Sequence, residues 1–156
     1  MLGVLSGFDS AEGPRLRREA SETSPLGGEV NVLASATGWP WPKALHDIFE
    51  PRGVNLMVAE KAEDFLSIIG QKRIKAVVFD LDSEIAGLAA VRIIRIVYPW
   101  LPFLVLKEQP DEELLLKALQ LDIFSVLEKP VDMQLLLQQL NRLFIKRYNS
   151  ELFADR

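Results

Sequence analysis

The sequence predicts an α/β protein in which helices cover both faces of one parallel sheet. From residue 30 onward, short apolar runs alternate five times with stretches whose apolar residues recur at helical spacing. Strands separated by helices need crossover connections, which place the strands parallel in one sheet. The third and fourth apolar runs contain no polar alternation, which is typical of strands buried on both faces.

The composition fits one globular domain and excludes several kinds of site. The chain has 156 residues, 49% of them hydrophobic, and a net charge of −4, so no basic excess indicates nucleic-acid binding. It has no cysteine and one histidine, His46, which excludes disulfides, thiolate zinc sites and multi-histidine metal sites. No stretch reaches the roughly 18 apolar residues of a membrane span. The start lacks the basic region of a signal peptide, so we expect a cytoplasmic protein that does not contact membranes.

Changes in composition divide the chain into three parts. Residues 1–28 are rich in small, polar and turn-forming residues, and we expect them to form a flexible tail. Residues 29–148 contain the alternating pattern and form the predicted domain. Residues 149–156 are expected to be a short tail, too short for an output domain.

In the first half of the domain, strands are predicted over residues 30–33, 54–58 and 76–79. Helices are predicted over 43–50, 62–70 and 84–97, with Ser83 as the N-cap of the third. Each helix is predicted from apolar residues that share one face, namely Leu45, Ile48 and Phe49; Phe65, Ile68 and Ile69; and Leu88, Val91 and Ile94.

In the second half, strands are predicted over residues 103–106 and 123–127. A proline followed by three acidic residues at 110–113 suits a helix start, and this helix is expected to reach Leu121. Asp132 is the predicted cap of the last helix. The apolar face of that helix consists of Leu136, Leu140, Leu143 and Phe144.

Ligand sites of parallel α/β sheets lie at the carboxyl ends of the strands. The residues expected to line such a site are Ala34, Ser35, Asp80, Asp82, Lys107 and Lys129. We expect the two lysines to converge on Asp80 and Asp82, because opposite charges at short range stabilise the ionised forms. Such a site is held closed by ion pairs.

The string Asp80-Leu81-Asp82 after an apolar strand resembles the first motif of the haloacid-dehalogenase-like phosphatases. In that family the first aspartate is the nucleophile and the second is the acid/base. The family also has a serine or threonine at the end of a later strand, where this chain has Lys107, and it has far more chain after the motif. This alternative implies phosphatase activity.

A second resemblance spans residues 30–146 and involves several motifs. The order of elements resembles the chemotaxis-regulator-like receiver domains of two-component signalling, in which Asp80 would stand at the phospho-acceptor position. Residues 98–106 resemble the segment leading into the fourth strand, and Lys129-Pro130 matches the family's Lys-Pro signature. The resemblance implies a flavodoxin-like (βα)5 three-layer sandwich with strand order 2-1-3-4-5. It also makes Pro130 a candidate for a cis peptide bond.

The chain departs from the receiver pattern at the phosphorylation site. Receivers hold Mg²⁺ with two acids after the first strand, but residues 34–37 are Ala-Ser-Ala-Thr. Lys107 stands where receivers carry a serine or threonine, and Val126 stands where they carry a switch aromatic. A weak Mg²⁺ site at Asp80 and Asp82 is all that remains. We therefore expect a degenerate receiver, or pseudo-receiver, that has no catalytic residues, needs no cofactor and is not an enzyme. The alternative is a working receiver that uses Asp80 with Mg²⁺.

Two surfaces are candidates for partner binding. The leucine runs at 114–116 and 135–137 exceed what one helical face can bury. In receivers, the face formed by the fourth helix, fifth strand and fifth helix is the usual dimerisation and output surface. The candidates there are Leu114, Leu116, Leu121, Val126 and Leu137. Trp39 and Trp41 follow the first strand, and tryptophan is enriched in binding hot spots. The expected partner is a histidine kinase, another regulator or a second copy forming a homodimer.

Overall fold

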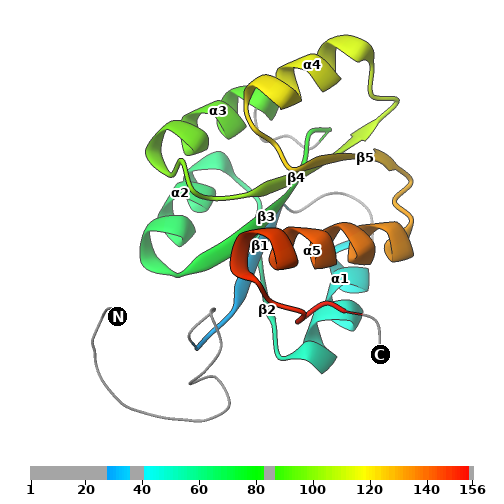
Figure 1. Ribbon diagram of the computed structural model, residues 1–156. Helices are drawn as coiled ribbons and strands as arrows, with labels where there is room; N and C mark the ends of the chain where they lie inside the picture. The colour runs from blue at the N-terminus through cyan, green and yellow to red at the C-terminus, as the bar shows by residue number, and fades with distance from the viewer. Residues whose placement is uncertain (1–27, 36–40, 83–86, 155–156) are drawn as a thin grey trace.

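The structure is a computed structural model that describes residues 28–35, 41–82 and 87–154 (Figure 1). Predictions for residues 1–27, Trp39, the side chain of Trp41 and the cap Ser83 lie outside the described residues. The elements in chain order are β1 Asn31–Ser35, α1 Trp41–Phe49, η2 Glu50–Arg52, β2 Asn55–Ala59, α2 Ala62–Gln71, β3 Ile74–Asp80, α3 Gly87–Val97, β4 Phe103–Glu108, α4 Glu112–Gln120, β5 Ser125–Lys129 and α5 Met133–Tyr148.

The five strands form one parallel sheet in the order β2-β1-β3-β4-β5, which confirms the predicted fold and strand order. In the register of the central strands, Asp80 lies opposite Leu106. Lys129 of β5 lies opposite Glu108 of β4. The carboxyl ends of β3, β4 and β5 therefore meet at one edge of the sheet.

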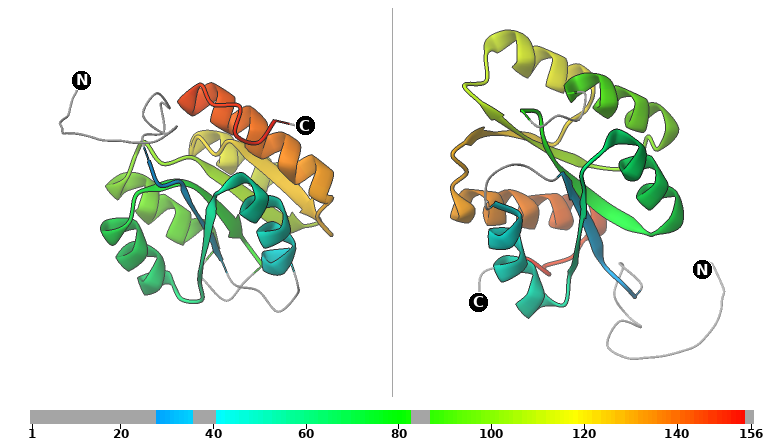
Figure 2. Two further views of the ribbon diagram at one scale, coloured as in Figure 1. Left: turned by 90° about the horizontal axis from the view of Figure 1, so that it is seen from below. Right: turned by 180° about the vertical axis from the view of Figure 1, so that it is seen from behind.

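Helices cover both faces of the sheet, and two apolar cores result. In Figures 1 and 2, α3 and α4 lie on one side of the sheet and α1 and α5 on the other. The core beneath α1 and α5 includes Leu45, Phe49, Leu140 and Phe144. The opposite core includes the Phe65 and Phe79 rings, whose centroids lie 5.2 Å apart. None of the described helices is long and apolar enough to cross a membrane.

An aspartate caps α4, and one of the three consecutive leucines of the helix faces inward. The Asp111 carboxylate accepts a hydrogen bond from the Leu114 N–H at 2.8 Å, so this residue, rather than Pro110, sets the first turn. Leu114 and Ala118, four residues apart, are buried. The prediction that Leu114 belongs to an interface is therefore wrong, and the exposed leucines of α4 are Leu115, Leu116 and Leu119.

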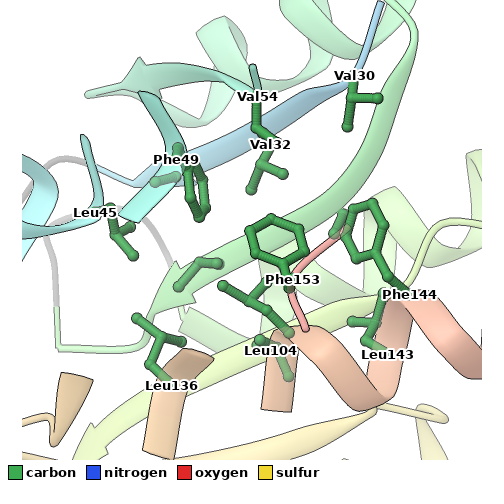
Figure 3. Packing of buried hydrophobic residues seen from close by; sticks show 14 of the residues in the cluster. Val30, Val32, Leu45, Phe49, Val54, Leu104, Leu136, Leu143, Phe144 and Phe153 are labelled. Carbon is green, nitrogen blue, oxygen red and sulfur yellow. The ribbon is translucent and has the colours of Figure 1, made fainter. Parts of the chain in front are cut away.

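The segment after α5 packs against the domain, although the sequence predicts a short tail there. Asn149 ends the helix in the left-handed conformation, with φ of 52°, and turns the chain back. Phe153 is then 1% exposed. Its ring lies between Phe49 and Phe144 in edge-to-face contacts, with centroids 5.4 and 4.8 Å away (Figure 3). The C-terminal segment thus completes the core between α1 and α5.

Candidate functional site

Four charged side chains meet at the carboxyl ends of β3, β4 and β5. Asp80 is the last residue of β3, and Asp82 follows two residues later. Lys107 lies near the end of β4, and Lys129 is the last residue of β5. Neighbouring parallel strands end at the same edge of a sheet, so residues far apart in the sequence come into contact there.

The Asp80 carboxylate is buried, and it accepts hydrogen bonds from Lys129 at the end of β5 and from its own loop. Its side chain is 1% exposed. Lys129 Nζ donates to both carboxylate oxygens, at 2.9 and 2.8 Å, and the Asp82 backbone N–H donates to Oδ1 at 2.8 Å. The Asp80 N–H donates to Ser35 Oγ at 2.7 Å. The Asp80 side chain is therefore paired with a cation and hydrogen-bonded, the condition under which a buried carboxylate is tolerated.

Asp82 links the buried pair to a second, more exposed lysine. Lys107 Nζ donates to Asp82 Oδ1 at 2.6 Å, and the Glu108 N–H donates to Oδ2 at 2.7 Å. Lys129 Nζ lies 3.2 Å from the same Oδ2, so it bridges both aspartates. Two carboxylates and two ammonium groups thus form one continuous network.

Three members of the network, Asp82, Lys107 and Lys129, have pKa values shifted toward their charged forms. Burial raises the pKa of Asp82, but hydrogen bonds from Lys107, Glu108 and Lys129 outweigh it and leave the pKa below its usual value. Burial lowers the pKa of Lys129, but the pairing with Asp80 and Asp82 outweighs it and raises the pKa overall. The hydrogen bond to Asp82 likewise raises the pKa of Lys107. These directions follow from charge pairing at short range.

The structure confirms that Lys107 and Lys129 converge on Asp80 and Asp82. Ser35 also contacts the site, through Asp80. Ala34, predicted to line it, is instead fully buried in the core beneath α1 and α5, because successive side chains of a strand point to opposite faces.

Two further sets of predicted residues lie outside the charged network. The peptide bond between Lys129 and Pro130 is cis. Besides buried Leu114, four interface candidates lie on the fourth and fifth β–α units. Leu116 is exposed, and Leu121, Val126 and Leu137 are half-buried and pack partly against the core.

The donor set does not suit Mg²⁺, the ion that receivers use. Within residues 28–35, 41–82 and 87–154, no three acidic, histidine or cysteine side chains gather as metal ligands. The oxygens of Asp80 and Asp82 already accept hydrogen bonds from lysine ammonium groups. A divalent cation would have to displace these groups and would be repelled by them.

Replacing Lys107 with threonine should raise the pKa of Asp82 toward its usual value of 3.8. A lowered pKa in the folded state stabilises the protein above the unfolded-state pKa, and this contribution is lost as the pH falls through the folded-state pKa. The variant should therefore be less stable than wild type at neutral pH, and the difference should shrink as the pH falls below 3.8 and vanish once Asp82 is protonated in the folded wild type. Carboxyl NMR titration and urea unfolding at several pH values measure the two effects.

Lys146→Thr removes an exposed lysine of α5, away from the site, and is the matched control. It should leave the Asp82 titration unchanged. An unchanged Asp82 pKa in the Lys107 variant would mean that the ion pair does not persist in solution.

Comparison with known proteins agrees with this geometry. A family model described as the response regulator receiver domain matches residues 42–141, more than half of the chain. An NtrX-like response regulator of Rickettsia typhi is 31% identical over 93 residues, which are 58% of this chain and 20% of that protein. The chain thus spans about a fifth of the length of the curated relatives it matches.

Solved structures show the same fold. The signal receiver domain of an HD domain-containing protein from Pseudomonas fluorescens Pf-5 has a TM-score of 0.70 at 22% identity, over 79% of this chain and 100% of that one. A response regulator receiver protein from Pseudomonas putida has a TM-score of 0.64 at 26% identity, over 73% and 96% of the two chains. The order of the strands and the placement of Asp80 and Lys129 agree with the family match. That match shows that the chain belongs to the response regulator receiver domain family of two-component signalling.

Proposed function

We propose that this receiver domain works through protein–protein contacts without being phosphorylated, and that it is not an enzyme. The observation that carries the proposal is the network in which Lys129 bridges Asp80 and Asp82 while Lys107 binds Asp82 from the other side. Its partner is another protein of the signalling system, such as a histidine kinase, another regulator or a second copy.

Phosphoryl transfer makes demands that this network opposes. The acceptor carboxylate must present an oxygen to the phosphorus while metal ions and positioned donors neutralise the developing charge. Both Asp80 oxygens accept hydrogen bonds from Lys129 instead. Lys107 is a permanent cation, paired with Asp82, where related receivers carry a hydroxyl. A site held closed by ion pairs gives one constant surface rather than two states that a phosphate selects.

A working receiver is the second candidate. Asp80 at the end of β3 and Lys129 beside it retain the arrangement that a phospho-acceptor needs. Under this alternative, an arriving phosphodonor and Mg²⁺ would displace the lysines. The family match does not support the phosphatase alternative.

Incubation with beryllofluoride or acetyl phosphate plus Mg²⁺ tests these functions. We expect the amide NMR spectrum to match that of the protein with Mg²⁺ alone, because the Asp80 oxygens stay bound to Lys129. Shifts near Asp80 that disappear in Asp80→Asn would instead establish a working receiver. Turnover of a generic phosphate ester that is lost in the same variant would establish a phosphatase.

A further inference from the structure

The outer face of α3 carries an apolar stripe that nothing in the described part of the chain covers. Ile93, Ile96, Val97 and Trp100 are each more than half exposed, and Ile96 is 73% exposed. Spacings of three and four residues place Ile93, Ile96 and Val97 on one side of α3, and Trp100 follows shortly after the helix ends at Val97. The buried residues of α3 lie on the adjoining face of the helix, and they are Ala90, Val91 and Ile94. Contiguous exposed apolar surface of this kind marks an interaction site.

A pocket of about 460 Å³ extends this stripe toward α4. Ala89 and Ile93 form part of its α3 wall, and Gln120 and Leu121 form part of its wall on the α4 side. Figures 1 and 2 show the two helices side by side on the same face of the sheet. Leu116, exposed one helical turn before Gln120, continues the apolar surface along α4. Two helices flanking an apolar groove suit a third helix as the occupant.

The groove is held in shape at its end by Arg95. The Arg95 guanidinium donates hydrogen bonds to the backbone oxygens of Leu121 and Asp122, at 3.1 and 3.2 Å, and to that of Pro99 at 2.8 Å. It also lies 5.3 Å from the centroid of the Phe103 ring. The end of α3 is thus tied to the turn after α4. Because the groove is already ordered, less conformational entropy is lost when a ligand binds.

The charges that line the groove are positive. Arg92 from α3 and Lys117 from α4 contribute to its wall, and no carboxylate is among its lining residues. Lys117 lies 3.4 Å from Glu113, but both side chains are largely exposed, and such pairs are weak. A carboxylate of a bound partner can therefore compete for Lys117.

We propose that the groove between α3 and α4 binds an amphipathic helix of a partner protein that carries acidic residues beside its apolar face. A second copy that docks through its own α3 is the less favourable occupant. The charged residues of α3, Gly87–Val97, are two arginines and no acids, so α3 packed against α3 of another copy would bring like charges together. An acidic helix instead pairs with Arg92 and Lys117 while its apolar residues cover Ile93 and Ile96.

This inference deepens the proposed function, and it rests on that function only in requiring that binding occur without phosphorylation. The groove lies on α3 and α4, whereas the phosphodonor experiment reports on Asp80. The binding experiment contains no phosphodonor, so each of the two proposals can fail without the other.

The test uses two designed helical peptides of about 14 residues, roughly four turns, with the same leucine stripe. One peptide carries glutamates beside the stripe and the other carries lysines. In amide NMR titrations of the full chain, the glutamate peptide should shift resonances of α3 and α4 and should bind about tenfold more tightly than the lysine peptide, or more. The variant R92E/K117E should reverse this preference. Ile96→Ser should weaken the binding of both peptides, because it removes apolar contact area from the groove.

The matched control is R142E/K146E, which makes the same change in net charge at two exposed residues of α5. It should keep the wild-type preference. Equal affinity for the two peptides, no binding of either, or shifts away from α3 and α4 would overturn the proposal. Sedimentation that shows a dimer abolished by Ile96→Ser would overturn it too, since a second copy would then occupy the groove.

Discussion

Replacing Lys129 with methionine should lower the free energy of unfolding by about 3–5 kcal/mol at neutral pH, because it leaves a buried carboxylate without its cation. Asp80 is 1% exposed and accepts two hydrogen bonds from Lys129 Nζ. Methionine has a similar volume but offers no donor. The remaining Asp82 N–H bond cannot compensate an ionised group in this environment. Urea or guanidinium unfolding measures the loss.

Two further variants separate the buried charge from other consequences of the substitution. Lys107→Met makes the same replacement on the adjacent strand, but the Lys107 side chain is 36% exposed and its pair with Asp82 contributes much less. The double variant D80N/K129M removes both members of the buried pair and should recover most of the stability, since no uncompensated ion remains. A Lys129 variant as stable as the Lys107 variant would show that Asp80 is well solvated and that the site is not closed.

This site was predictable from the sequence because it depends on topology. Alternating apolar runs and helical stretches predict the parallel sheet. Once the strands are parallel, Asp80, Lys107 and Lys129 must approach one another at their carboxyl ends. The sequence does not give which ammonium bonds to which carboxylate, because that depends on the register of β4 and β5 and on side-chain reach.

The exposed apolar surfaces of α3 and α4 were less predictable, because the sequence does not show which side of each helix faces the core. In a run of three leucines, periodicity alone does not say which one faces the core, and in the structure it is Leu114, on the same side of α4 as buried Ala118. Helix α3 is apolar on nearly every side, so its buried residues predict the helix but hide the exposed stripe that includes Ile93 and Ile96. Only the packed structure separates the two faces.

Phe153 could not be assigned from the sequence. It follows the last helix as a single aromatic residue without periodic neighbours, and its contacts, Phe49 and Phe144, come together only when α1 and α5 pack on the same face. The signal that was available is Asn149, a residue that tolerates the left-handed conformation and can turn the chain back after a helix.

Replacing Phe153 with alanine should lower the free energy of unfolding by about 3–5 kcal/mol, because it leaves a cavity in the core between α1 and α5. The ring is 1% exposed and packs edge-to-face against two fully buried phenylalanines. The Arg52 guanidinium lies 6.0 Å from its centroid and loses that contact as well. Denaturant unfolding measures the loss, and amide hydrogen exchange should show reduced protection in α1 and α5.

Ile145→Ala is the matched control, because it truncates an apolar side chain of α5 that is 44% exposed, and it should change stability by about 0.5 kcal/mol or less. Phe153→Leu should fall between the two, since leucine refills part of the volume without the aromatic contacts. If the alanine variant of Phe153 is as stable as that of Ile145, the segment after Tyr148 does not dock in solution. The folded domain would then end where the sequence pattern ends, and Phe49 and Phe144 would need another covering group.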